Sequence, residues 1–252
     1  MAKKKKNNYV NALMKIFYSA GFLTIILASS WWSGLKEDGT IKLKFSDTDI
    51  LNIKTYESLV SKIIEDKTID NKITKITLLI EDHPYVKAAR VSKHYPSEIR
   101  IEIMEREPLA IVNIDPMVLL DEGGFVLPDL GNLINYDLPV MSNFNSDKEL
   151  YPYGGKAKSV KVIECISFLS KLKHQYKRLY DNLSEIKISS NNEIELILAD
   201  QPTHIYLGNE NINFRMNVLK EFEKELNPKT ISGFSYIDIR YNNQVIAKRR
   251  NS

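Results

Sequence analysis

The chain has 252 residues, of which 43% are hydrophobic and 27% are charged, a balance typical of one or two folded domains rather than of a disordered chain. Five of the 35 basic residues lie in the first fifteen positions, which hold no acidic residue. The remaining chain therefore carries 30 basic and 32 acidic residues and lacks the positive charge of a nucleic-acid-binding protein. The single cysteine, Cys165, excludes an internal disulfide.

The N-terminal segment has the pattern of a membrane anchor. A lysine-rich tail, residues 1–15, precedes a run of 17 uncharged residues from Ile16 to Trp32. This run is slightly shorter than the roughly 20 residues of a typical membrane-spanning helix, and the tryptophan pair at its end suits a membrane interface. We expect a cytoplasmic tail at 1–15 and a transmembrane helix at 16–35.

Charge on the two sides of this run predicts the topology. Lysines precede it and mixed charges follow it, which places residues 36–252 outside the cytoplasmic membrane. A cleaved signal peptide is the alternative, because Ala28-Ser29-Ser30 offers small residues after an apolar core. Both interpretations put residues 36–252 on the same side.

Periodicity predicts a small α+β layer before residue 113. Apolar residues alternate with charged ones in the strands and recur every three or four positions in the helices. The elements are a strand over Ile41–Phe45, helices over Thr55–Asp66 and Ile69–Glu81, and strands over Val86–Tyr95 and Glu98–Glu105. The last two strands form a hairpin whose turn contains Pro96, which has no N–H for pairing.

A second region with strands and two amphipathic helices is predicted after the break at Glu107-Pro108. Its elements are a strand over Leu109–Asn113, a hairpin over Val118–Leu127, a short edge-like segment over Leu138–Met141, a helix over Val160–Tyr180, strands between Glu185 and Leu207, a helix over Ile212–Leu226, and strands over Tyr236–Tyr241 and Gln244–Ala247. Cys165 falls on the apolar face of the first helix, so we expect a core residue and not a nucleophile.

No catalytic, metal-binding or nucleotide-binding motif stands out. Gly154-Gly155-Lys156 does not continue a phosphate-binding loop, because Leu150 and Ala157 occupy positions where that motif needs Gly and Ser or Thr. The four histidines are far apart and have no partner at metal-ligand spacing. The adjacent acids Asp121-Glu122 are expected to serve a turn. We therefore expect no catalytic residue, no metal and no cofactor.

The segment Asp238-Ile239-Arg240-Tyr241 is the strongest candidate for a binding surface. It lies on a strand whose edge no later strand covers, unless Gln244–Ala247 folds back. An uncovered edge offers unpaired N–H and C=O groups to another chain, and an Arg beside a Tyr is typical of interface hot spots. The alternative is an interior strand with Arg240 paired to a local carboxylate.

Short motifs occur along the chain in a recognisable order. They are His83-Pro84-Tyr85-Val86, Ala89-Arg90-Val91, Tyr95-Pro96, Ile101-Glu102-Ile103, Glu105-Arg106-Glu107-Pro108, the turn from Leu120 to Phe125, Leu138-Pro139-Val140, the segment from His204 to Gly208, and Tyr236–Tyr241. In this order they resemble the FtsQ/DivIB family of bacterial cell-division proteins. The chain departs from the family at Phe45-Ser46-Asp47, where a Val-x-Gly turn is usual.

The resemblance implies an α+β architecture and a role in division. It implies an N-terminal transmembrane helix, a POTRA-like βααββ domain at 36–112 and a mixed β domain with two flanking helices at 113–252. It also implies a non-enzymatic divisome assembly protein, single-pass in the inner membrane at the septum, with residues 36–252 periplasmic. Its C-terminal β edge would bind the coiled-coil membrane proteins FtsB and FtsL by strand addition.

Carried over residue by residue, the resemblance implies a set of partner-binding positions: Tyr236, Asp238, Arg240, Tyr241, Asn242, Asn243 and Val245. It also links Val91 and Lys93 to recruitment by other division proteins. It implies no nucleic acid and no small-molecule substrate. The alternative function is a POTRA-bearing chaperone or docking module for outer-membrane or secreted proteins, but such proteins carry several POTRA units or a long barrel region, and neither pattern occurs here.

Overall fold

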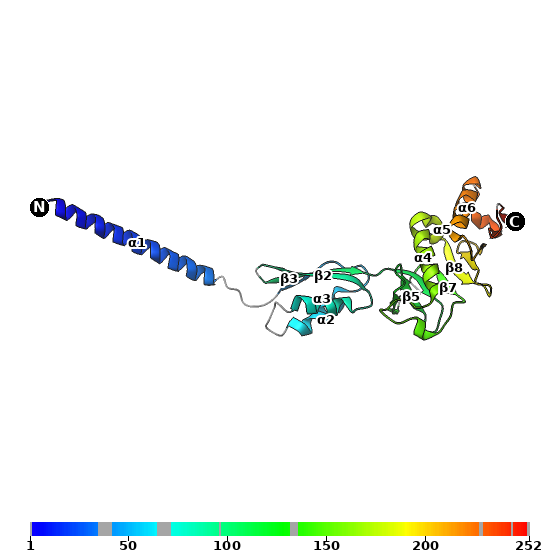
Figure 1. Cartoon of the computed structure of the whole chain (residues 1–252), viewed down its shortest axis with the longest axis horizontal. Helices are drawn as coiled ribbons and strands as arrows, with labels where there is room; N and C mark the ends of the chain where they lie inside the picture. The colour runs from blue at the N-terminus through cyan, green and yellow to red at the C-terminus, as the bar shows by residue number, and fades with distance from the viewer. Residues whose placement is uncertain are drawn as a thin grey trace. The chain divides into compact units, whose positions relative to one another are not determined.

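The structure is a computed structural model that describes residues 2–34, 42–64, 72–95, 97–131, 136–226, 229–242 and 244–250. It divides into two compact units. The first comprises Met1–Ser46 with Arg90–Glu102, and the second comprises Asp47–Ala89 with Ile103–Ser252. Figure 1 shows the elements along the chain.

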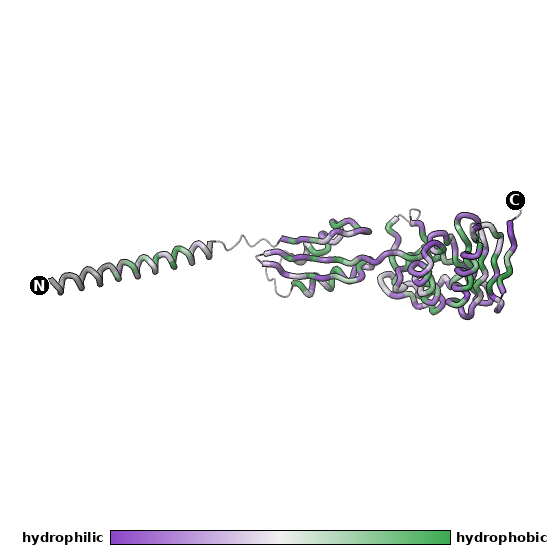
Figure 2. Tube along the Cα trace, turned by 90° about the horizontal axis from the view of Figure 1, so that it is seen from above, coloured by the Kyte–Doolittle hydropathy of each residue, from purple (hydrophilic) through white to green (hydrophobic). Residues whose placement is uncertain are grey.

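The first unit begins with a long helix. This helix, α1, covers Ala2–Gly34, and Figure 2 shows hydrophobic residues along its later turns. Within the described residues, no helix combines the length and the hydropathy needed to cross a membrane. The transmembrane helix expected at 16–35 is therefore not confirmed.

A short strand and a hairpin form a three-stranded sheet. Strand β1 (Lys42–Phe45) pairs in parallel with β3 (Glu98–Glu105), with Leu43 opposite Ile99. Strand β2 (Val86–His94) pairs with β3, and the sheet order is β1-β3-β2. The turn residue Pro96 and the expected first strand residue, Ile41, lie outside the described residues.

Two helices connect β1 to β2. Helix α2 covers Ile53–Ile64 and α3 covers Lys72–Glu81, so the predicted order of strand, two helices and two strands is confirmed. Tyr56 and Val60 of α2 are buried, as are Ile76 and Ile80 of α3, and in each helix the two residues are one turn apart. The expected helix ends at Asp66 and Ile69 lie outside the described residues.

Within the described residues, the second unit carries a nine-stranded mixed sheet of order β12-β11-β10-β9-β8-β7-β4-β5-β6. The strands are β4 (Pro108–Val112), β5 (Val118–Asp121), β6 (Val126–Leu127), β7 (Val140–Ser142), β8 (Leu183–Ile188), β9 (Ile194–Leu198), β10 (His204–Gly208), β11 (Phe234–Asp238) and β12 (Ile246–Arg249). The hairpin predicted over Val118–Leu127 is confirmed as β5 and β6.

Strand β7 corrects one prediction. The segment Leu138–Met141 was expected at an edge, but β7 lies between β4 and β8 and is parallel to both. Pro139 has no N–H to donate, yet its carbonyl accepts a hydrogen bond from Ile111 N–H at 3.0 Å. The proline therefore marks the start of a short interior strand rather than an exposed edge.

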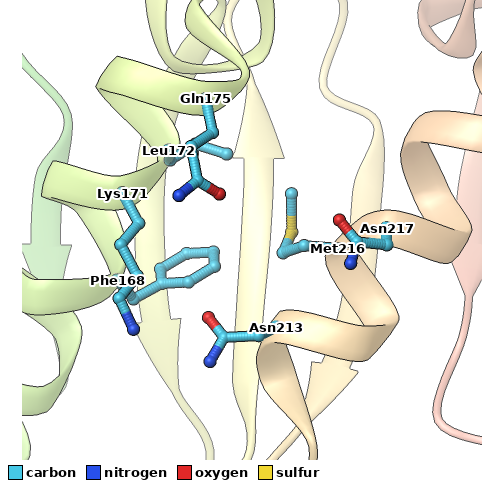
Figure 3. Close-up of a pocket in the computed structure, with 7 residues that line it drawn as sticks. All are labelled: Phe168, Lys171, Leu172, Gln175, Asn213, Met216 and Asn217. Atoms are coloured by element: carbon cyan, nitrogen blue, oxygen red, sulfur yellow. The ribbon is translucent and has the colours of Figure 1, made fainter.

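Two longer helices cover one face of this sheet. Helix α4 (Val160–Gln175) and helix α6 (Ile212–Glu225) share a core with the strands, and Figure 3 shows both helices in front of the strands. Cys165 is fully buried in this core, so its prediction as a core residue is confirmed.

The helix expected over Val160–Tyr180 is broken. Tyr176 has φ −145° and ψ 56°, and the short helix α5 (Lys177–Asp181) follows it. The Tyr176 hydroxyl donates a hydrogen bond to the Glu223 carboxylate of α6. This tertiary contact lies 47 residues away in sequence, so helical periodicity alone does not reveal the break.

Candidate partner-binding edge

The outer strand of the nine-stranded sheet is β12. It pairs antiparallel with β11, with Ala247 opposite Ile237 and Lys248 opposite Tyr236. Among the described residues, no strand pairs with its other side. The alternative in which the segment after Tyr241 folds back is therefore confirmed, because β12 pairs with β11 and takes the edge position in place of residues 236–241.

The reversal has a local cause at the end of β11. The Asp238 carboxylate accepts a hydrogen bond from the N–H of Arg240 at 3.1 Å, two residues further on. An Asp side chain that binds backbone in this way favours a turn over a continued strand. The expected strand over Tyr236–Tyr241 thus ends at Asp238.

Hydrogen bonds of Arg250 hold the C-terminal end of strand β12 in place, and the strand carries positive charge. The N–H of Arg250 donates to the Gly233 carbonyl at 3.1 Å, and its guanidinium binds the Thr203 hydroxyl at 3.3 Å. Lys248 and Arg249 are exposed. A charged edge strand resists self-association and favours a partner of opposite charge.

Arg240 is held by carboxylates of its own chain. Its Nη2 and Nε donate to Asp238 at 2.6 and 3.0 Å, and its Nη1 donates to Glu193 at 2.9 Å. Its guanidinium carbon lies 5.2 Å from the centre of the Tyr206 ring. The local-carboxylate alternative therefore describes Arg240, although one third of its side chain is exposed.

Arg215 of α6 links the end of β10 to the segment that follows β11. Its guanidinium donates to the Leu207 carbonyl and, at 3.0 Å, to the Arg240 carbonyl. It passes close to Gly208, whose φ of +77° suits glycine. Neither Arg215 nor Glu193 was predicted from the sequence as a site residue. The one available signal was Gly208 at a strand end, which marks a close approach of another group.

The pKa of the Asp238 carboxyl reflects two opposing effects. Burial alone raises its pKa, but the hydrogen bonds and charge of Arg240 together with the charge of Arg215 outweigh burial, so the pKa lies below its ordinary 3.8. A depressed carboxyl pKa stabilises the fold above the unfolded value, and this stability is lost as pH falls through the folded value.

We therefore expect Asp238→Asn to lower the free energy of unfolding by about 1–2 kcal/mol at neutral pH, because a charge-assisted hydrogen bond is lost. The difference from the parent chain should close as pH falls below 3.8. Denaturant titrations at neutral and acidic pH measure it, with Asp200→Asn at an exposed carboxyl as control. A difference that stays constant down to the lowest pH would contradict the account.

A groove lies beside the edge strand. Its volume is about 280 Å³, and its walls include Phe214 of α6 with Tyr241, Asn242 and Val245. The side chains of Phe214 and Tyr241 are 60% and 51% exposed. Two exposed aromatic rings at a groove beside a free strand can take an apolar anchor from a bound polypeptide.

The predicted site residues fall into separate places. Tyr241, Asn242 and Val245 meet at the groove, whereas Tyr236 and Asp238 lie on β11 inside the sheet. Val91 and Lys93 lie on β2, in the first unit. Asn243 lies outside the described residues.

Two further cavities have different linings. One, of about 310 Å³ between α4 and α6, has apolar Phe168, Leu172 and Met216 beside Lys171 and three amide side chains, as Figure 3 shows. In the described residues, no group of three or more His, Cys, Asp or Glu side chains is arranged to hold a metal.

A larger cavity of about 650 Å³ gathers the carboxylates of Glu105, Glu107, Asp121 and Glu122. Each of these carboxylates already has a partner within the chain. Glu105 accepts backbone N–H groups, Asp121 binds Arg106, and Glu107 and Glu122 both lie within 4 Å of the Lys173 ammonium. These contacts are structural: Glu105 binds backbone groups and the other three carboxylates form ion pairs.

Comparison of the sequence with known proteins identifies the family of this chain. Residues 107–248, which run from the residue before β4 into β12, match the family described as "FtsQ/DivIB, C-terminal related". The chain belongs to the FtsQ/DivIB family. The resemblance inferred from the motifs is thus confirmed.

Individual FtsQ relatives cover most of the chain. It is 26% identical over 219 residues to the cell division protein FtsQ of Geotalea daltonii, covering 84% of this chain and 78% of that protein. It is 26% identical to FtsQ of Syntrophotalea carbinolica, covering 70% of this chain and 61% of that protein. FtsQ of Geobacter sp. strain M21 is 22% identical, with coverage of 73% and 66%. These FtsQ relatives indicate a cell-division protein.

Proposed function

We propose that this chain is a non-enzymatic assembly protein of the divisome that captures a strand of another division protein along β12. The observation that carries the proposal is the unpaired outer side of β12 in the described structure, within the region that matches the family. Strand addition to such an edge supplies main-chain hydrogen bonds, and nearby pockets supply specificity.

The partners that we propose are FtsB-like and FtsL-like coiled-coil membrane proteins. Lys248 and Arg249 favour a strand with acidic side chains. The groove beside Tyr241 and Phe214 favours an apolar side chain next to that strand. Arg240 is already neutralised by Asp238 and Glu193, so its proposed role is a shared ion pair at the rim rather than a free cation.

We further propose a single membrane anchor at residues 16–35, with the N-terminus in the cytoplasm and residues 36–252 in the periplasm at the septum. Support comes from the uncharged run Ile16–Trp32 and from exposed apolar side chains along α1 such as Phe17, which is 81% exposed. The proposed domains are a POTRA-like domain at 36–112 and a β domain at 113–252. Val91 and Lys93 are proposed contacts for other division proteins.

Charge reversal on the edge strand tests the proposal. We expect Lys248→Glu/Arg249→Glu to weaken capture of FtsB-like and FtsL-like partners from detergent-solubilised membranes by about tenfold or more, because like charges would face each other along the strand. The matched control is Lys158→Glu/Lys171→Glu, the same charge change at exposed lysines outside β12. Equal capture by the edge variant, the control and the parent chain would refute partner docking at β12.

A further inference from the structure

A buried tyrosine links the start of β2 to the nine-stranded sheet inside the second unit. Tyr85 is fully buried and packs with Ile111, Leu119 and Leu127 of β4, β5 and β6. Its hydroxyl donates to the Pro128 carbonyl at 2.7 Å. The residue that precedes β2 therefore belongs to the core of the larger sheet.

The loop before α2 is tied to the same place. The Glu105 carboxylate, at the end of β3, accepts hydrogen bonds from the N–H groups of Asp49, Ile50 and Leu51 at 2.7, 2.7 and 3.0 Å. It also accepts one from the Tyr56 hydroxyl of α2 at 2.8 Å. These bonds hold Ile50 and Leu51 against the apolar cluster around Tyr85.

Arg106 connects three backbone segments at this point. Its Nε donates to the Val86 carbonyl at 3.1 Å, and its Nη1 donates to Asp121 at 2.8 Å. Its guanidinium carbon lies 3.7 Å from the centre of the Phe125 ring, and its N–H donates to the Tyr85 carbonyl at 2.8 Å. The Arg106 and Asp121 side chains are 13% and 6% exposed.

We infer that Arg106 holds the α2–α3 segment and the nine-stranded sheet together, so that the two move as one body. We call the contacts of Arg106 with Val86, Asp121 and Phe125 the joint. A planar guanidinium fixes the direction of each group that it binds. Here those groups come from β2 and from the β5–β6 hairpin, with the shared apolar cluster beside them. This inference does not depend on which partner binds β12.

Spin labels on both sides of the joint test it. Cysteines replace Lys75 on α3 and Ser167 on α4, both exposed. The native Cys165 does not compete for the label, because it is fully buried and burial raises its pKa to about 12. Double electron–electron resonance on the full chain should give one narrow distance distribution, and Arg106→Met should widen it about twofold or more.

Two further variants decide the outcome. Arg90→Met removes an arginine that is 80% exposed and 3.9 Å from Glu102, and it should leave the distribution unchanged. Arg106→Met/Asp121→Leu removes both buried charges, so no unpaired buried charge remains and the chain should fold even if Arg106→Met alone does not. The double variant should still widen the distance distribution. A broad distribution in the parent chain, or a narrow one in the double variant, would overturn the inference.

Discussion

Proline at position 247 is expected to prevent partner capture without unfolding the sheet. The Lys248 carbonyl accepts a hydrogen bond from the Ser235 hydroxyl of β11 at 3.1 Å, so the Lys248 backbone faces β11. Because successive residues of a strand face opposite neighbours, the N–H of Ala247 faces outward. Ala247→Pro thus removes a donor that an incoming strand needs, and its ring obstructs that strand.

The expected loss of affinity is about tenfold or more, since an unmade hydrogen bond in an interface costs about 1–3 kcal/mol. Titration of purified chain with a soluble partner segment measures it. Lys248→Pro is the matched control. It removes a hydrogen bond to β11, so it should lower the unfolding temperature, whereas Ala247→Pro should not. Undiminished binding by Ala247→Pro would show that the partner does not pair with β12.

Loss of the Asp121 carboxylate is expected to be the most destabilising single change at the joint. This carboxylate accepts hydrogen bonds from Arg106 at 2.8 Å and from the N–H groups of Gly123 and Phe125 at 2.9 and 2.8 Å. Asp121→Ala leaves the Arg106 cation buried without its partner, which costs about 3–5 kcal/mol of unfolding free energy.

The adjacent residue supplies the control for that measurement. Glu122 pairs with His174 and Lys173 but its side chain is 38% exposed, and Glu122→Ala should cost about 0–1 kcal/mol. Denaturant unfolding of the two variants gives the comparison. A cost for Asp121→Ala no greater than that for Glu122→Ala would mean that the buried pair does not stabilise the joint.

The elements that depend on local periodicity could be predicted from the sequence. Alternation of Ile99, Ile101 and Ile103 with charged residues predicts β3, and the spacing of Val162, Cys165 and Leu169 predicts α4. Both patterns arise from the geometry of a single segment. They are therefore visible without knowledge of what packs against that segment.

Sheet order could not be predicted in the same way, because it depends on contacts between distant segments. Nothing near Val140 indicates that β4 and β8 lie on its two sides. Alternation of Ile237 and Ile239 suggests a strand that continues past Asp238, yet the hydrogen bonds of Asp238 to Arg240 end it. The unpaired edge of the sheet therefore belongs to β12 and not to β11.

Side-chain pairs that are remote in sequence were also beyond prediction. Arg240 meets Glu193, 47 residues away, and Arg106 meets Asp121, 15 residues away, at the end of the β4–β5 pairing. The resemblance predicted partner-binding positions between residues 236 and 245, and the structure brings three of them, Tyr241, Asn242 and Val245, to one groove. Residue spacing in the sequence does not reveal that Phe214 and Val218 of α6 also line that groove.

Amide hydrogen exchange along β12 shows directly whether a partner strand pairs with this edge. The full chain is exchanged in deuterated buffer with and without a soluble FtsB-like segment, and protection is read residue by residue over 246–249. We expect outward-facing amides such as that of Ala247 to exchange freely in the unbound chain and to become protected in the complex. Protection confined to another surface, with the β12 amides unchanged, would contradict it.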